Sequence, residues 1–209
     1  VLTADPPAPV EGQVWVVANP GTASVMKGYA LGTGAWASGG NLNTKRYGAG
    51  GAGVQTAGSL IAGDADGGSP RYGLHEQYNG SSWTETVDVN TGGSYMGATG
   101  TQTAAVKFGG YSPDRHDETE IWNGSSWTEV GEMNTARFGV ASVGHTNTSA
   151  FAAGGSSGAD ATADVVEQWN GTSWAEVAEI NTGRAYFGGS GLTTAGVVFG
   201  GGPDTGKTE

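Results

Sequence analysis

Hydrophobic and polar residues alternate along this chain in short runs, and the runs are separated by Gly, Asn and Ser. Residues 138–143, 149–153, 165–169 and 173–177 form such runs in succession. A period of two is typical of half-buried β-strands, and the separating residues are those that tight turns prefer. The pattern therefore predicts short strands joined by tight turns.

The same string of residues recurs after each group of runs. It reads Tyr-Asn-Gly-Ser-Ser-Trp-Thr-Glu at 78–85, and it returns with small changes at 122–129 and 169–176. With a degenerate copy near Trp36, the tryptophans Trp36, Trp83, Trp127 and Trp174 are 47, 44 and 47 residues apart. Asn-Thr pairs at Asn43, Asn90, Asn134 and Asn181 keep this spacing. A period of this size indicates a propeller or another repeat array.

Each repeat can be divided into four strands, called a to d in chain order. A glycine pair ends strand b at 109–110, 154–155 and 200–201, and we expect Gly63-Asp64 to hold this place in the first repeat. A residue without a Cβ allows a positive φ or a close backbone approach there. An Asn-Gly pair follows each complete strand c, which predicts a type I′ turn with positive φ at both residues.

The predicted fold is an all-β, small β-propeller of four blades that is closed by pairing of N- and C-terminal strands. The complete blades cover about 46–90, 93–134 and 137–181, and the closing blade combines 184–209, where 207–209 begin a strand c, with 11–43. Closure removes open sheet edges. We expect residues 11–209 to form a single domain behind a Pro-rich extended linker at 1–10. A five-bladed ring with residues beyond Glu209 and the role of the spare strand 11–17 remain open.

Four features recur in register in these repeats. An Arg precedes strand a, a glycine pair ends strand b, an aromatic residue ends strand c, and a Trp lies in strand d. This pattern resembles the kelch repeat over about residues 24–206, and the resemblance implies a propeller of that type. Gly93 replaces the Arg in the second blade, and Gly63-Asp64 replaces the glycine pair in the first. The residues that carry the resemblance are Arg46, Arg137, Arg184, Tyr78, Trp122, Trp169, Trp83, Trp127 and Trp174.

A second resemblance concerns bacteriophage tail-fibre and other virion surface proteins. The segment 9–15, Pro-Val-Glu-Gly-Gln-Val-Trp, followed by 25–29 is similar to a short hairpin of such fibres. The Gly-Thr-Gln-Thr-Ala segment at 100–104, with a variant at 54–57, resembles kelch-like arrays of phage structural proteins. This resemblance implies a location on a virion surface, outside the cell.

Composition narrows the range of partners. The net charge of −11 argues against nucleic acid, which needs clustered Lys and Arg, and against an anionic membrane surface. No run of about 18 apolar residues is present, so we expect no membrane insertion. The chain has no cysteine, so disulfides and thiolate metal sites are excluded. Its 40 glycines and 14% charged residues favour turns and short strands.

We expect the repeated aromatic residues and arginines to be structural. One aromatic per strand in register would pack sheet against sheet. The arginines would bond, between blades, to the backbone or to glutamates that are also in register, Glu76, Glu120 and Glu167. Five aromatic residues break the repeat: Trp15, Tyr47, Tyr95, Tyr111 and Tyr186.

The loops between strands b and c differ from repeat to repeat, at 64–72, 111–119, 156–163 and 202–206. Antiparallel blades would place them on one face, together with the loops between strand d and the next strand a. Variable loops on a rigid scaffold are common binding sites. The candidate binding face therefore consists of Asp64, Asp66, Arg71, Tyr111, Asp114, Arg115, His116, Asp117, Asp160, Asp164 and Asp204.

Metal and cofactor sites are weakly indicated. Asp64 and Asp66 lie in a Gly-Asp-Ala-Asp-Gly-Gly segment that resembles an oxygen-rich calcium loop but lacks its further carboxylates. Ca²⁺ and a solvated loop remain alternatives there. His75, His116 and His145 show no metal-ligand spacing, and no other cofactor is expected.

No acid–base pair, Cys nucleophile or phosphate loop stands out, so we expect a protein that is not an enzyme. The expected function is that of a virion surface module, in a tail fibre or a decoration protein, for host attachment or particle assembly. Its partners would be other virion proteins or a host-surface glycan or protein, and an oligomer is compatible with the spare strand. One alternative is a bacterial surface or secreted propeller that binds glycans. A lyase or glycosidase is a third hypothesis, although the strand a sequences offer almost no carboxylates for it.

Overall fold

The computed structural model describes residues 14–17, 25–28, 38–65, 70–158, 161–202 and 208–209. The chain divides into two compact units, Val1–Ser38 and Gly39–Glu209. In the first unit, β1 (Val14–Val17) pairs antiparallel with β2 (Val25–Gly28). The predicted linker 1–10 and Trp36 lie outside the described residues, and the assignment of 11–43 to a closing blade stays a prediction.

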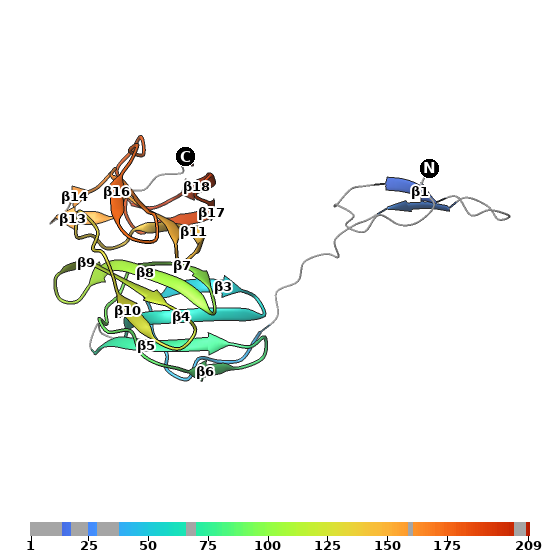
Figure 1. Ribbon diagram of the computed structural model, residues 1–209, viewed down its shortest axis with the longest axis horizontal. Helices are drawn as coiled ribbons and strands as arrows, with labels where there is room; N and C mark the ends of the chain where they lie inside the picture. The colour runs from blue at the N-terminus through green and yellow to red at the C-terminus, as the bar shows by residue number, and fades with distance from the viewer. Residues whose placement is uncertain (1–13, 18–24, 29–37, 66–69, 159–160, 203–207) are drawn as a thin grey trace. The chain divides into compact units, whose positions relative to one another are not determined.

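The second unit contains three four-stranded antiparallel sheets, and in each the strands a, b, c and d lie side by side in chain order (Figure 1). The first sheet contains β3 (Gly50–Val54), β4 (Ala57–Asp64), β5 (Arg71–Tyr78) and β6 (Trp83–Glu85). The second contains β7 (Gly97–Thr101), β8 (Ala104–Tyr111), β9 (Arg115–Trp122) and β10 (Trp127–Glu129). The third contains β11 (Ala141–Thr146), β12 (Ser149–Ala153), β15 (Val166–Trp169) and β16 (Trp174–Glu176). These repeated sheets confirm the predicted all-β class and are consistent with propeller-like blades.

A fourth sheet begins with β17 (Gly188–Leu192) and β18 (Ala195–Phe199). Thr208 bridges Phe199, and the backbones of Glu209 and Val198 exchange hydrogen bonds of 2.8 and 2.9 Å. Residues 208–209 thus stand where strand c stands in the other sheets. A separate small hairpin of β13 (Ser156–Gly158) and β14 (Ala161–Thr162) lies between strands b and c of the third sheet.

The four a strands lie side by side in the order β3, β7, β11, β17. Residues of all four line one cavity of about 420 Å³. Hydroxyl groups link neighbouring a strands, because Thr99 donates to the Gly144 carbonyl at 2.6 Å and Ser142 donates to the Ala98 carbonyl at 2.8 Å. The small residues of strand a therefore allow four sheets to converge around a common space.

The turns between strands c and d differ from the predicted type I′ form. Four residues, 79–82 in the first sheet, join the two strands. Only the glycine of the Asn-Gly pair has a positive φ, +93° at Gly80. The side-chain oxygen of Asn79 accepts hydrogen bonds from the N–H groups of Ser81 and Ser82, at 3.0 and 2.9 Å. The prediction was wrong because the same dipeptide also serves a longer turn in which Asn acts as a side-chain acceptor.

Two residues of positive φ lie at the C-terminal end of strand b, or directly after it, in every sheet, at 62–63, 109–110, 154–155 and 200–201. In the first sheet this pair is Ala62-Gly63, with φ of +55° and +114°, and the predicted Gly63-Asp64 was one residue out of register. The Gly63 N–H donates to the Gly93 carbonyl at 2.7 Å, whereas the equivalent donors of the next two sheets meet Arg carbonyls. The two departures from the repeat, at 62 and 93, therefore lie at the same contact between sheets.

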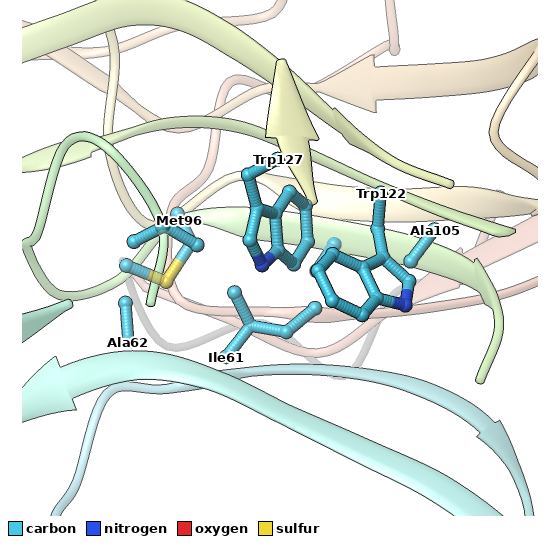
Figure 2. Close-up of a cluster of buried hydrophobic side chains, with 8 residues drawn as sticks. Ile61, Ala62, Met96, Ala105, Trp122 and Trp127 are labelled. Carbon is cyan, nitrogen blue, oxygen red and sulfur yellow. The ribbon is translucent and has the colours of Figure 1, made fainter. Parts of the chain in front are cut away.

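The core fills the spaces between successive sheets. Ile61 and Ala62 of β4 lie in a buried cluster with Trp122 and Trp127 of the second sheet (Figure 2). Figure 2 shows both indole rings directed toward Ile61. Such rings carry a large share of the buried apolar area.

The next interface repeats this arrangement. Phe108 of β8 packs edge-on against Trp174, with ring centroids 4.9 Å apart, and Trp169 is fully buried. Tyr78 and Trp83 of the first sheet hold the same places in strands c and d, and they are half-buried. The aromatic pair of each of the second and third sheets thus covers strand b of the sheet before it.

Candidate functional site

A buried carboxylate lies at the centre of each complete sheet, supplied by Glu76, Glu120 and Glu167. Glu76 Oε2 accepts hydrogen bonds from the backbone N–H and the side-chain amide of Asn43, both at 2.8 Å. Because Asn43 precedes strand a of the same sheet, each linker is fastened to the sheet that follows it. The same contacts join Asn90 to Glu120, Asn134 to Glu167 and Asn181 to Glu209.

Three of these carboxylates pair with an arginine. Arg46 Nη1 lies 2.6 Å from Glu76 Oε1, and Arg137 Nη2 lies 2.8 Å from Glu167 Oε1. The third pair joins Arg184 to Glu209. Each arginine therefore pairs with a glutamate of the sheet that follows it in the chain, and the expectation that these pairs join different blades was wrong.

Lys107 supplies the cation of the second sheet, where Gly93 stands in place of Arg. Its Nζ lies 2.7 Å from Glu120 Oε1 and 2.9 Å from the Thr91 carbonyl, and the side chain is 1% exposed. It comes from strand b, directly opposite Glu120 on β9. The repeat pattern did not predict this residue, although a lysine inside an otherwise small and apolar strand was an available signal.

The hydrogen-bond and ion-pair partners of these carboxylates all come from the protein itself. Burial raises the pKa of the Glu76 carboxyl, but hydrogen bonds from Asn43, Arg46 and Thr44 outweigh it and hold that pKa below its ordinary value. Removing one partner of a buried ion pair is costly, because the other charge is left buried without compensation. The arrangement therefore stabilises the linkers and presents no free reactive group.

A different set of residues gathers where strands b end and strands a begin. Isolated bridges join these two segments in each sheet, between Tyr47 and Asp64, Ser94 and Tyr111, Phe138 and Ser156, and Ala185 and Gly202. This end also carries the loops between strands b and c, and we call it the b–c face. The hairpins between strands a and b lie at the opposite ends of the same strands.

One aromatic ring from each sheet meets on the b–c face. We call Tyr47, Tyr95, Phe138 and Tyr186 the axial tyrosine cluster. The Tyr95 centroid lies 6.1 Å from that of Tyr47, 6.4 Å from Phe138 and 5.3 Å from Tyr186. Tyr47 and Tyr186 are 42% and 57% exposed, and the other two rings are half-buried. The cluster therefore joins residues from four sheets in one solvent-exposed aromatic surface.

The backbone beneath these rings is strained at two positions. Tyr95 and Tyr186 have φ of +56° and +57°, whereas the equivalent places in the other two sheets hold Gly48 and Gly139. A hydrogen-bond ladder fixes this geometry, since Tyr95 donates to Gly48 at 2.6 Å, Gly139 to Tyr95 at 2.7 Å and Tyr186 to Gly139 at 2.8 Å. A left-handed conformation costs a residue with a Cβ about 1–2 kcal/mol. Strain of this kind is frequent at functional sites.

Three predicted residues of the binding face form a rim beside this cluster. Tyr111 packs against Phe138 at 5.2 Å, and the Arg71 guanidinium lies 4.9 Å above the Tyr111 ring. Arg71 Nε is also 3.6 Å from the carboxylate of Asp64, which is 3% exposed. Burial and the nearby Tyr47, Tyr186 and Asp64 raise the pKa of Tyr95 above its ordinary value. The structure thus brings Asp64, Arg71 and Tyr111 together, with the aspartate buried.

The rest of the predicted face is more dispersed. Arg115, His116 and Asp117 lie in β9, so the expected loop 111–119 was wrong and only 112–114 joins strands b and c. The ladder resumes beyond the positive-φ pair, with Tyr111 opposite Arg115, and this extends both strands. Asp114 and Asp164 are exposed, while Asp66, Asp160 and Asp204 lie outside the described residues.

Within the described parts of the chain, no three His, Asp or Glu side chains are close enough to hold a metal ion. No helix among those residues has the length and apolar character needed to span a bilayer. The sequence matches no protein-family model and no curated protein. The function is therefore inferred from the geometry of the site.

From the sequence, Tyr47, Tyr95 and Tyr186 were expected to break the repeat. The structure shows that they keep it, because each lies one or two residues after the position of Arg46, Gly93 or Arg184. The available signal was the four dipeptides at this place, Tyr-Gly, Ser-Tyr, Phe-Gly and Ala-Tyr, which each contain one aromatic residue.

Proposed function

We propose that the chain is a closed four-bladed β-propeller of the kelch type, in which N-terminal strands complete the fourth sheet. At the first two interfaces, the aromatic pair of one sheet covers strand b of the sheet before it. At the third, Val143 and Val198 line a groove with a cavity of about 130 Å³. Residues 208–209 already begin strand c of that sheet, so residues 25–37 would add only its missing aromatic residues, Tyr29 at the end of strand c and Trp36 in strand d. A five-bladed ring with further residues is the alternative.

Closure predicts that Trp36 is part of the folded core. Trp36→Ala should lower the free energy of unfolding by about 3–5 kcal/mol, as expected when a buried Trp is truncated. Trp174→Ala, which opens an interface already described, serves as the matched control. Chemical unfolding followed by far-UV circular dichroism measures both, and an unchanged midpoint for Trp36→Ala alone would contradict closure.

We further propose that this protein is a non-enzymatic binding module on a virion surface, in a tail fibre or decoration protein. It would attach to a host-surface glycan or protein, or to other virion proteins during assembly. The observation that supports binding is the axial tyrosine cluster, in which rings from four sheets, two of them exposed, share one face of the β scaffold. The virion location rests on the fibre-like hairpin and the Gly-Thr-Gln-Thr-Ala segment of the sequence.

The same cluster also favours one alternative, a bacterial surface or secreted propeller that binds glycans. Exposed aromatic rings beside Asp64 and Arg71 are the kind of surface this alternative requires. The two proposals share their binding face and differ in where the protein resides. Immunogold labelling of virions and of bacterial envelopes from a culture that expresses the gene distinguishes them.

Attachment through the b–c face can be tested by blocking it. The chain has no cysteine, so one introduced cysteine directs a polyethylene glycol chain to a single place. Ser157 is exposed on β13 beside the b–c face, and Thr194 is exposed in an a–b hairpin at the opposite end. The variants Ser157→Cys and Thr194→Cys therefore carry the polymer at the two ends. Both coupled proteins, labelled with a fluorophore, are offered to a panel of bacterial isolates.

We expect the polymer at 157 to abolish adhesion to the isolates that the uncoupled protein recognises, and the polymer at 194 to leave it intact. Equal adhesion by both coupled proteins would place the contact elsewhere. An uncoupled protein that adheres to no isolate would contradict the attachment function itself.

A further inference from the structure

We infer that the axial tyrosine cluster is the contact surface for a neutral, hydroxyl-rich glycan. This inference rests on the proposed attachment function and gives it a ligand class and a set of residues. None of Tyr47, Tyr95 and Tyr186 was a candidate binding residue on sequence grounds.

The cluster offers ring surface that is both exposed and braced. Tyr186 and Tyr47 expose 57% and 42% of their surface, yet both contact the Tyr95 ring edge-to-face, at 5.3 and 6.1 Å. Aromatic faces held in this way can stack on the C–H faces of a sugar ring, and tyrosine hydroxyl groups donate and accept hydrogen bonds with sugar hydroxyls. The surface therefore has both parts of a glycan contact.

The backbone indicates that these tyrosines serve more than packing. Gly48 and Gly139 take the same positive-φ place in two of the four sheets, and glycine meets the demands of the ladder without strain. A Cβ at Gly139 would lie 3.1 Å from the Tyr186 ring, so that ring lies directly over the glycine of the neighbouring sheet. Tyr186 thus keeps a strained backbone while more than half of its surface remains in water, which burial alone does not explain.

Local charge selects against anionic ligands. Asp64 is buried beside the cluster, and its Oδ1 has no hydrogen-bond partner among the described residues. Arg71, a cation at the rim of the cluster, lies between Asp64 and the Tyr111 ring, and the chain carries a net charge of −11.

The geometry of the rings argues against a cationic ligand. A quaternary ammonium group is bound by ring faces that surround it. Here the rings pack against one another, with Tyr95 edge-on to both Tyr47 and Tyr186. The cluster is therefore a platform, and a flat neutral sugar ring fits it better than a spherical cation.

The test uses the full chain and saturation-transfer difference NMR with oligosaccharides of mannose, galactose and glucose, together with sulfated forms of each. A paired variant, Tyr47→Ser with Tyr186→Ser, removes the two exposed rings. The matched control, Val54→Ser with Leu192→Ser, removes two side chains of 58% and 51% exposure from the opposite ends of the a strands. Circular dichroism checks that both variants are folded.

We expect at least one neutral oligosaccharide to bind, with saturation transfer to its ring protons, and the sulfated form to bind at least fivefold more weakly. The tyrosine variant should bind at least tenfold more weakly, and the control variant within twofold of the original chain. Preference for sulfated sugars, loss of binding in the control alone, or no binding of any neutral sugar would overturn the inference. If adhesion to cells through the b–c face persists in that case, only the ligand class is wrong; if adhesion is also absent, the proposed function fails too.

Discussion

His75 makes the interface between the first two sheets sensitive to acid. It lies in β5, fully buried, with its ring edge-on to Trp122 and Trp127 at 4.8 and 5.3 Å. Its Nδ1 accepts from the Trp127 indole N–H at 3.3 Å and lies 2.9 Å from the Thr86 hydroxyl. An indole nitrogen only donates, so Nδ1 carries no proton and the ring is neutral.

The size of the effect follows from the pKa of this ring. Burial, with a smaller contribution from the charge of Arg46, lowers the pKa of His75 from 6.5 to about 4. Above pH 6.5 both folded and unfolded states hold a neutral ring, and the group adds no pH dependence. Between pH 6.5 and 4 only the unfolded state takes up the proton, so stability falls as the pH falls. A shift of about 2.5 units at 1.36 kcal/mol each corresponds to about 3.4 kcal/mol, or roughly 10 °C in Tm.

The matched variant is His75→Thr, which copies the next sheet. There Thr119 holds the equivalent place and accepts from the Trp174 indole N–H at 2.8 Å. Urea unfolding followed by tryptophan fluorescence at pH 7.5, 6.5, 5.5 and 4.5 gives the free energy of each protein. Glu76, whose pKa is also lowered, loses its contribution at acid pH in both proteins and cancels in the comparison. We expect the original chain to lose about 2–3 kcal/mol more than the variant between pH 7.5 and 4.5, and parallel curves would refute the argument.

Three further predictions concern the ion pairs, the glycine pairs and the tyrosines. Lys107→Met leaves the buried Glu120 without its cation and should lower the free energy of unfolding in urea by about 3–5 kcal/mol. Adding Glu120→Gln should recover part of that loss. A decrease under about 1 kcal/mol for Lys107→Met would be inconsistent with a buried pair. Gly154→Ala should cost about 2 kcal/mol or more, because φ is +57° and the new Cβ would lie 2.6 Å from the Arg184 carbonyl oxygen; an unchanged thermal midpoint would contradict this. Tyr95 should ionise above its ordinary pKa, because burial and neighbouring groups disfavour its phenolate. Ultraviolet titration of Tyr95→Phe should therefore lose absorbance change only at the alkaline end of the curve, and a loss at the lower end would be inconsistent with this.

Much of the fold could be predicted because the repeat marks equivalent positions. Trp127 and Trp174 recur in one register, and the structure places both in the core between sheets. The glycine pairs at the end of strand b likewise indicated a backbone of positive φ. Tryptophan and paired glycines each occur in few structural settings, so their repetition at a fixed spacing predicted their structural roles.

Other features depend on pairing that a linear pattern does not contain. Lys107, from strand b, replaces an arginine that the other sheets take from the linker before strand a, and only the register of β8 against β9 places it opposite Glu120. Ala62 adopts a conformation that its type disfavours, so the pair in the first sheet was assigned one residue too late. The turn at Asn79 was misassigned because one dipeptide serves two turn types.

The candidate site was predicted only in part for a similar reason. Arg71 and Tyr111 belong to different sheets, and the structure stacks them at 4.9 Å. Tyr95 and Tyr186 occupy a left-handed position that holds glycine in the other two sheets. In the aligned repeats these two rings therefore lie one residue later than Tyr47. The convergence of these rings is a product of four sheets meeting at one end.

The attachment of each linker to the sheet that follows it defines a unit of gene duplication. A segment that runs from one Asn-Thr pair to the end of the next strand d, such as 90–129 or 134–176, contains both partners of its Asn–Glu contact, the amide donor and the carboxylate. Its cation is also internal, whether it is Lys107 or Arg137. Copying or deleting such a segment leaves no buried carboxylate without partners, whereas a break placed after the linker would separate Asn from Glu. Changes in the number of repeats are therefore best tolerated when recombination falls just before the Asn-Thr pairs.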